Sequence, residues 1–341
     1  MGKKKTDSVE QTIAKNFGDN ILVSGHSLIE RQNIVIPVSP KLDLILGGGI
    51  PEGSMVIFTG HPKFGKSVSA LDFASTCQQP KYGGEFCPNG RDVYYYNVEG
   101  RLKKRDLLGI PNLNLDKFHI IESTPGKILH GEEYLQIADT LINSKVGTVH
   151  IIDSYSALCT EAELTSGMNQ MQRADGAKLL SKFCRKIANV IPVNKSIVIG
   201  ITHLMGNPTG YGKAFKEKSG QSIAYQVDVK LYATAMRAWN DKNEQQIGQE
   251  TDWQCVTSPI GPPGKKTTSY IRYGEGIDKL QEIITLSIDL GIIQQSGTWY
   301  KFFFINKEEP PNVQGIDNIK PKLLENPKWL EKLNTKIQQL I

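Results

Sequence analysis

Long apolar runs are absent from the sequence, and no segment approaches the roughly 20 consecutive apolar residues that a membrane-spanning helix needs. The N-terminus, MGKKKTDSVEQ, is basic but lacks the apolar stretch of a secretory signal peptide. These absences exclude the usual classes of integral membrane protein and secreted protein. We therefore expect a cytoplasmic protein that has no membrane partner.

Cysteine is scarce, and the net charge is small. The five cysteines are odd in number and show no metal-site spacing, which indicates reduced thiols. The 40 basic and 35 acidic residues give a formal net charge of +5, which permits an anionic partner without requiring one. With 39% hydrophobic and 22% charged residues and no repeats, the 341-residue chain is typical of a globular protein.

The most specific pattern lies in VIFTGHPKFGKSVSALDFA, residues 56–74. Gly60, Gly65, Lys66 and Ser67 fill the pattern G-x-x-x-x-G-K-S/T. The flanking residues predict a strand before the loop and a helix after it, which disfavours a chance match. We expect Mg²⁺ on the Ser67 hydroxyl and a polyphosphate on Gly60, His61, Pro62, Lys63, Phe64, Gly65, Lys66, Ser67 and Val68.

Strands and helices alternate through the middle of the chain. Apolar strands are predicted in DVYYYNVEG, DKFHIIEST, GTVHIIDSYSAL, SIVIGITHL and VDVKLYATAM. Such strands separated by helices predict an α/β fold with a mostly parallel, twisted sheet covered on both faces. We also predict a short N-terminal helix over 8–17 and a polar hairpin in AWNDKNEQQIGQETDW. The expected parts are 1–30, a helix and linker; 31–275, the core; and 276–341, a small α+β domain.

Two carboxylates follow predicted strands. Asp153 ends the strand in GTVHIIDSYSAL and Glu99 follows the strand in DVYYYN. Ligands of open parallel sheets bind at the carboxyl ends of the strands, so Asp153 is a candidate metal residue. Glu99 is a candidate for orienting or deprotonating an attacking water. A carboxylate kept at a strand end for solvation is the alternative for both.

A histidine and a basic loop follow the next strand. His203 ends SIVIGITH, where a polar side chain can sense the γ-phosphate or simply satisfy a strand end. The loop after it interleaves cationic and aromatic residues, the combination that binds phosphates and stacks on bases of single-stranded nucleic acid. An equally acceptable reading is a solvated lid. The candidate DNA-binding residues of this loop are Tyr211, Lys213, Phe215, Lys216 and Lys218.

Taken together, these segments resemble the RecA family of recombinases over nearly the whole chain. GGGIPEGSMVIFTGHPKFGKS resembles the family's opening strand and P-loop, and IIDSYSALCTEAEL resembles the stretch that carries its metal-site aspartate. IRYGEGID followed by DLGIIQQSGTWY resembles the start of the bacterial C-terminal domain. The irregular P-loop and a histidine at position 203, where glutamine is usual, are similar to T4-type phage (UvsX-like) recombinases.

The resemblance implies a RecA-like ATPase core and a role for each matched residue. Lys66 and Ser67 serve phosphate and Mg²⁺, Glu99 is the base for water, and Asp153 holds the metal. Tyr273 packs on the adenine, and His203 links ATP to DNA. The implied DNA loops are Leu164–Arg173 and Met205–Gly220, with phosphate contacts from Arg173, Lys178 and Arg185. The N-terminal helix docks on a neighbouring subunit in a helical filament.

Several positions depart from the family pattern. In the bacterial proteins two lysines reach the ATP of the neighbouring subunit, and here Thr257 and Pro259 replace them. That contact is then missing unless Lys265 or Lys266 makes it. Lys103 replaces an acid near the adenine edge, which suggests looser base selectivity. A basic terminal helix gathers duplex DNA or is only a solvated face; its cationic residues are Lys320, Lys322, Lys328, Lys332 and Lys336.

We therefore predict an ATP- and Mg²⁺-dependent recombinase, a DNA-dependent ATPase that polymerises on single-stranded DNA and exchanges it with a homologous duplex. Its expected partners are single- and double-stranded DNA, further copies of itself, and single-strand-binding and mediator proteins. Two alternatives remain open at this point: a hexameric helicase-like motor on the same core, and a non-hydrolysing DNA-binding mediator.

Overall fold

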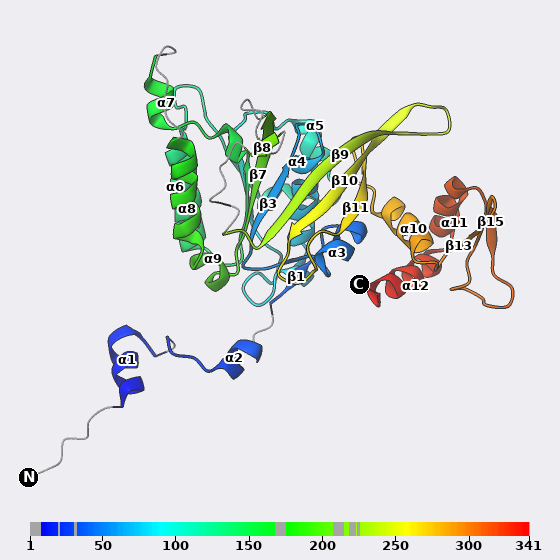
Figure 1. The fold of residues 1–341 in the computed structure, drawn as a ribbon, viewed down its shortest axis with the longest axis horizontal. Helices are drawn as coiled ribbons and strands as arrows, with labels where there is room; N and C mark the ends of the chain where they lie inside the picture. Colours follow the sequence, from blue (N-terminus) through cyan, green and yellow to red (C-terminus); the bar gives the residue numbers. More distant parts are fainter. Residues whose placement is uncertain are drawn as a thin grey trace, which may run out of the picture. The chain divides into compact units, whose positions relative to one another are not determined.

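A computed structural model of the protein describes residues 8–19, 21–30, 33–167, 175–206, 215–217, 223 and 226–340 (Figure 1). The chain divides into two compact units, one ending at residue 34 and the other running from Val35 onward. Among the described residues, no helix is both long enough and apolar enough to cross a bilayer.

In the described part of the first unit there are two short helices, α1 (Val9–Phe17) and α2 (Gly25–Glu30). Ser8 begins α1 with a capping box to Gln11, and Gly18 ends it at a φ of 111°. The predicted helix over 8–17 is confirmed. None of its residues is buried, and its apolar side chains Val9 and Phe17 are 73% and 71% exposed.

The second unit is built on one large sheet, for which the described residues supply ten strands. In spatial order, the strands are β12 (Gly276–Ile277), β11 (Lys266–Arg272), β10 (Gln246–Thr257), β9 (Val229–Asn240), β3 (Met55–Gly60), β7 (Ile197–Gly206), β6 (Val149–Asp153), β4 (Val93–Asn97) and β5 (Phe118–Ile121), with β8 (Phe215–Glu217) paired to the end of β7. From β9 to β5 the neighbours are parallel, whereas β10, β11 and β12 are antiparallel. The predicted α/β fold with a mostly parallel sheet is confirmed.

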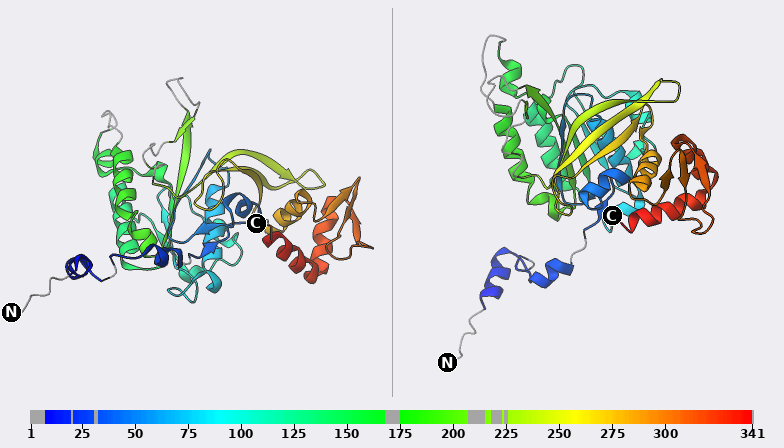
Figure 2. Two further views of the ribbon diagram at one scale, coloured as in Figure 1. Left: turned by 60° about the horizontal axis from the view of Figure 1, so that its bottom comes forward. Right: turned by 45° about the vertical axis from the view of Figure 1, so that its right-hand side comes forward.

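Helices cover the two faces of the parallel strands. α6 (Gly131–Ser144) and α8 (Asp175–Ile187) lie side by side against one face, with α9 (Val190–Val193) below them (Figure 1). Their apolar side chains share a core with alternate residues of the strands, among them Ile57, Tyr96 and Ile152. α4 (Lys66–Cys77) packs across β3, β6 and β7 on the other side (Figure 2). Because both faces are covered, the central strands are apolar on both sides.

The remaining elements are short or lie towards the C-terminus. β9 and β10 continue past the sheet as the predicted polar hairpin (Figure 1). A C-terminal group has its own apolar core and a three-stranded sheet. Its elements are α10 (Lys279–Asp289), β13 (Gln294–Ser296), β14 (Trp299–Lys301), β15 (Asn312–Gln314), α11 (Ile319–Glu325) and α12 (Pro327–Gln338).

The other elements are β1 (Val35–Ile36), α3 (Pro40–Leu46), β2 (Ile50–Pro51), α5 (Lys104–Leu108), α7 (Glu161–Thr165) and 3₁₀ turns at Pro80–Tyr82, Leu115–Lys117, Tyr155–Ala157 and Ile316–Asn318. The division at residues 30 and 275 stays a prediction.

Candidate nucleotide-binding site

The glycine-rich loop joins β3 to the N-terminus of α4, as the sequence predicts. Its two motif glycines stand where a side chain would meet close neighbours and strain the backbone. A Cβ on Gly60 would lie 2.7 Å from the carbonyl oxygen of Ala233, and one on Gly65 would lie 2.1 Å from Ile271 Cδ1. Gly65 also has a φ of 75°, in the left-handed region. The loop therefore wraps closely over its own sheet and leads into the N-terminus of α4, where the unpaired N–H groups of a helix bind anions.

Lys66 lies inside this loop. Its side chain is buried, and Nζ donates to the carbonyl oxygens of Gly60 at 3.0 Å and His61 at 2.6 Å. Burial lowers the pKa of Lys66 to about 8, while Asp153 and Glu99 act in the opposite direction. A bound polyphosphate would raise the pKa of Lys66 again, because an opposite charge nearby favours the charged state.

Asp153 ends β6 next to the P-loop. Its Oδ2 accepts a hydrogen bond from the hydroxyl of Tyr95 at 2.6 Å. Burial raises the pKa of Asp153, although hydrogen bonds from Tyr95 and Ser67 oppose that rise. A buried carboxylate beside a serine hydroxyl is a suitable oxygen donor pair for Mg²⁺. The predicted metal residues, Ser67 and Asp153, are thus brought together.

Glu99 follows β4 and completes a cluster with Asp153 and His203. Its Oε1 accepts hydrogen bonds from Ser154 Oγ at 2.6 Å and from His203 Nε2 at 2.8 Å. The His203 bond lowers the pKa of Glu99 to about 2, against the effect of burial. One ligand atom from each of the three residues lies within 4.8 Å of the others. Glu99 is therefore ionised at neutral pH and held by His203.

The site residues fit ATP and Mg²⁺ on chemical grounds. The carboxylates, a serine hydroxyl and a buried ammonium converge at the carboxyl ends of β4, β6 and β3, where parallel sheets bind ligands. His203 Nδ1 is buried and, among the described residues, has no hydrogen-bond partner. With Nε2 donating to Glu99, Nδ1 of the neutral ring is an acceptor, which a water bound at the phosphate can satisfy.

Some residues that support the site were not anticipated from the sequence. Tyr95 and Ser154 hold the two carboxylates, and the alternation of β4 was the signal that could have placed the Tyr95 hydroxyl beside Asp153. Gln249, on β10, donates from Nε2 to the carbonyl oxygen of Lys63 at 3.2 Å and to Thr251 Oγ1 at 3.2 Å. No local pattern could have found that contact with the P-loop.

Tyr273, the expected adenine contact, lies just after β11. It is 54% exposed, and its hydroxyl accepts from Gln246 Nε2 at 2.8 Å. Ile271, two residues earlier, is the residue that lies under Gly65. Tyr273 is therefore close in sequence to a residue that touches the P-loop, and its role stays a prediction.

The expected DNA-binding residues are only partly described. Arg173, Tyr211, Lys213 and Lys218 lie outside the described residues, and of Lys216 only the backbone is described, opposite Met205 on β7. Phe215 is 46% exposed on β8. Lys178 and Arg185 are exposed two turns apart on α8. They line a shallow groove of about 330 Å³ together with Ala177, Ser181 and Gln226.

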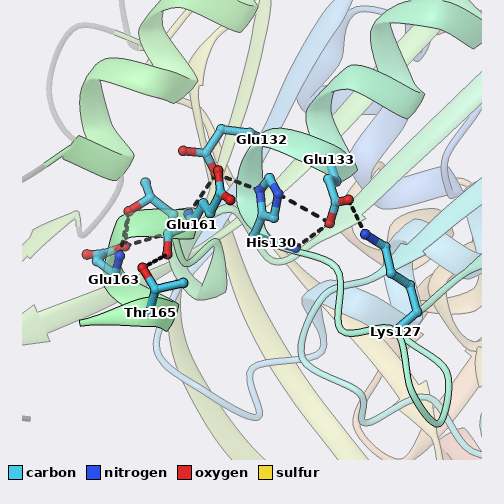
Figure 3. Close-up of polar contacts among 8 residues, drawn as sticks. Lys127, His130, Glu132, Glu133, Glu161, Glu163 and Thr165 are labelled. Atoms are coloured by element: carbon cyan, nitrogen blue, oxygen red, sulfur yellow. Dashed lines mark hydrogen bonds and ion pairs between the residues drawn. The ribbon is translucent and has the colours of Figure 1, made fainter. Parts of the chain in front are cut away.

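The segment before the first expected DNA loop is held by a polar cluster at the start of α6, which we call the α7 clasp: His130, Glu132 and Glu161 (Figure 3). Glu132 Oε2 accepts from the backbone N–H of Glu161 at 3.0 Å and from His130 Nδ1 at 2.9 Å. His130 Nε2 lies 3.4 Å from Glu133 Oε2, and Glu133 also pairs with Lys127. The clasp fixes the N-terminus of α7 to α6.

Comparison with known proteins places this geometry in a family. The model of the RecA N-terminal domain matches residues 4–278, and that of the RecA C-terminal domain matches residues 281–341. The chain is similar to the protein RecA of Thermotoga neapolitana, with 29% identity over 99% of this chain and 93% of the relative. It is 29% identical to RecA of Helicobacter hepaticus, over 100% of this chain and 95% of the relative. It is 30% identical to RecA of Thermotoga maritima, over 99% of this chain and 92% of the relative. Since both domain models match and together leave almost no residue uncovered, the chain belongs to the RecA family.

Proposed function

We propose that this RecA-family chain is an ATP-dependent recombinase that assembles as a helical filament on single-stranded DNA and exchanges that strand with a homologous duplex. RecA-family proteins are DNA-dependent ATPases built on a P-loop. The observation that carries the proposal is the cluster of Glu99, Asp153 and His203 next to Lys66, in a chain that both RecA domain models match.

The nucleotide part of the proposal assigns roles to residues of this chain. Lys66 and the N-terminus of α4 bind the phosphates, and Ser67 with Asp153 holds Mg²⁺, which supplies charge neutralisation when bound. Glu99, oriented by Ser154, positions the attacking water, and it accepts the water's proton when the hydrogen bond from His203, which lowers the Glu99 pKa, is released. Tyr273 packs on the adenine. Lys265 and Lys266, both exposed, are the candidates for reaching the nucleotide of a neighbouring subunit.

The DNA part of the proposal begins at His203. Because His203 contacts Glu99 and lies on β7, which leads into the second expected DNA loop, movement of its ring connects nucleotide and DNA. Lys178 and Arg185 offer cations along one groove. The proposed set of DNA contacts is Arg173, Lys178, Arg185, Tyr211, Lys213, Phe215, Lys216 and Lys218.

Assembly and partners complete the proposal. The exposed apolar side chains of α1 support docking on a neighbouring copy. For duplex DNA, the exposed lysines of α12 offer a surface, namely Lys328, Lys332 and Lys336. Lys320 of the predicted set is instead half-buried in an ion pair with Asp278, and Lys322 lies beside Glu325. Single-strand-binding and mediator proteins remain proposed partners, and the T4-type phage subtype remains a proposal that rests on His203 and the P-loop sequence; the relatives named above are bacterial.

Phosphate release with and without single-stranded DNA tests the function. We expect strong stimulation by DNA, loss of activity in Glu99→Gln, and DNA affinity that falls steeply with salt because phosphate contacts dominate. Strand exchange between labelled oligonucleotides should depend on ATP. Tight DNA binding without phosphate release would instead favour a mediator, for which Thr257 and Pro259 are the supporting observation. Absence of both activities would overturn the proposal.

A further inference from the structure

An aromatic contact joins the P-loop to the β7–β8 hairpin. The ring of His61 meets the ring of Phe215 edge-on, with centroids 4.5 Å apart and planes at 89°. His61 also packs against Phe64, at 5.5 Å. Phe215 lies on β8, opposite Gly206 of β7, and is far from His61 along the chain. A residue of the phosphate-binding loop thus touches a residue expected to bind DNA.

The backbone of the same histidine contacts Lys66. The carbonyl oxygen of His61 accepts from Lys66 Nζ at 2.6 Å. A triphosphate in the loop competes for that ammonium, because a phosphate oxygen is a stronger partner for a buried cation than a neutral carbonyl. A triphosphate bound in the loop therefore acts on His61, the residue whose ring contacts Phe215.

The hairpin end that receives this contact is small. β8 has three residues, and within the described residues it pairs with β7 alone. A two-stranded ribbon is marginally stable in water, so a single aromatic contact changes its position or occupancy measurably. Phe215 is also half exposed, which leaves part of its ring available to a stacked base.

We propose that His61 is a positioning residue that couples the nucleotide-binding loop to the β7–β8 hairpin through Phe215, as a second connection beside the one from Glu99 to His203. The inference rests on the proposed function, since it assumes that ATP and single-stranded DNA bind to this chain. By reciprocity, the factor by which ATP tightens DNA binding equals the factor by which DNA tightens ATP binding. The His61–Phe215 contact supplies part of that factor.

The test measures the linkage ratio, the Kd for a fluorescent oligo-dT without nucleotide divided by the Kd at saturating, slowly hydrolysed ATP analogue. We expect His61→Leu to lower the ratio about fivefold, or about 1 kcal/mol. His61→Phe, which keeps a ring, should retain the ratio within about twofold. A weaker ATP site alone leaves the ratio unchanged at saturation, so the readout separates coupling from binding.

His119→Leu is the matched control, because it also removes a histidine ring from an aromatic contact: His119 lies on the edge strand β5 and stacks on Tyr94. In a double-mutant cycle, Phe215→Leu should lower the ratio no further in the His61→Leu background. An unchanged ratio in His61→Leu, or full additivity with Phe215→Leu, overturns the inference while the proposed function stands. A ratio near one in the unmodified protein overturns both.

Discussion

At the scale of single residues, the nucleotide site is defined by charges whose pKa values follow from their contacts. Burial lowers the pKa of Lys66 to about 8, and the hydrogen bond from His203 lowers that of Glu99 to about 2. Burial raises the pKa of Asp153. Ligand binding and pH therefore act on the same side chains, and each can be used to probe the other.

Proton uptake should accompany ATP binding. A triphosphate favours the ammonium form of Lys66, so the pKa rises on binding and, at about pH 8, about half a proton enters each site. ATP affinity should accordingly fall as the pH rises above about 8. Calorimetry in buffers of different ionisation enthalpy measures the uptake. Lys66→Arg keeps the charge but does not titrate, so equal uptake in that variant would contradict the assignment.

Glu99 should make stability depend on pH in the acid range. Its folded-state pKa lies below the ordinary value of 4.5, so its contribution is present above about pH 4.5 and is lost as the pH falls towards about 2. In that window we expect the unmodified protein to lose about 1–3 kcal/mol of unfolding free energy that Glu99→Gln does not lose. Urea unfolding across the pH range measures the difference. Parallel curves for the two proteins would rule out this contribution.

At the scale of elements, charged side chains hold two segments in place. One is the irregular segment between α4 and β4, and the other is the N-terminus of α7. Arg91 closes the segment between α4 and β4: it pairs with Glu52 and donates to the carbonyl oxygens of Tyr82 at 2.8 Å, Gly147 at 3.1 Å and Lys195 at 2.8 Å. Its side chain is fully buried. The α7 clasp performs a similar task at the start of α6.

Removing Arg91 should be costly. Arg91→Met leaves Glu52 buried without its main partner, for which we expect a loss of about 3–5 kcal/mol in unfolding free energy. The double variant with Glu52→Leu should recover part of that loss, because no buried charge then remains unpaired. Thermal or urea unfolding measures both, with the exposed Lys81→Met as control. If Arg91→Met were as stable as the control Lys81→Met, the pair of Arg91 and Glu52 would contribute little to stability.

Breaking the α7 clasp should weaken DNA binding. Glu132→Ala removes the acceptor for the Glu161 N–H, and we expect a loss of about threefold to tenfold in affinity for single-stranded DNA. Glu161→Ala is a charge-matched control, since it removes the same charge nearby but leaves the backbone N–H in place. Fluorescence anisotropy with labelled oligonucleotides compares them. If both variants bind equally, charge rather than α7 placement is responsible.

At the scale of the whole molecule, the N-terminal unit has exposed apolar side chains on a short helix. An isolated helix as short as α1 is marginal in water, so a packing partner is needed for stability. A docking surface on a neighbouring copy meets that need under the proposed function. Filament assembly then follows because α1 cannot bury its apolar side chains within its own subunit.

Charge on that face should prevent assembly. Each of Val9 and Phe17 contributes about 1.5–3 kcal/mol when fully buried, so replacing both with Asp should weaken the subunit contact at least tenfold, by a rough estimate. Light scattering and electron microscopy should then show short oligomers in place of filaments. ATP binding should persist, since the nucleotide site lies in the second unit. Long filaments from the double variant would place the contact elsewhere.

Local patterns in the sequence were enough to predict the fold class, the P-loop and the strand-end carboxylates. Gly60, Gly65 and Lys66 have fixed spacing, and Glu99 and Asp153 follow apolar strands whose carboxyl ends share one edge of a parallel sheet. Periodicity and nearest-neighbour stereochemistry act over a few residues, so they can be read along the chain.

Only the tertiary structure decided which distant side chains meet. The contacts of Gln249 with Lys63, of Arg91 with Glu52 and of His61 with Phe215 join residues on different strands and loops. Such pairs depend on strand order and register, which packing of the whole sheet selects and which no local spacing encodes. The sequence by itself therefore determined the catalytic candidates, whereas the fold determined how they are supported and coupled.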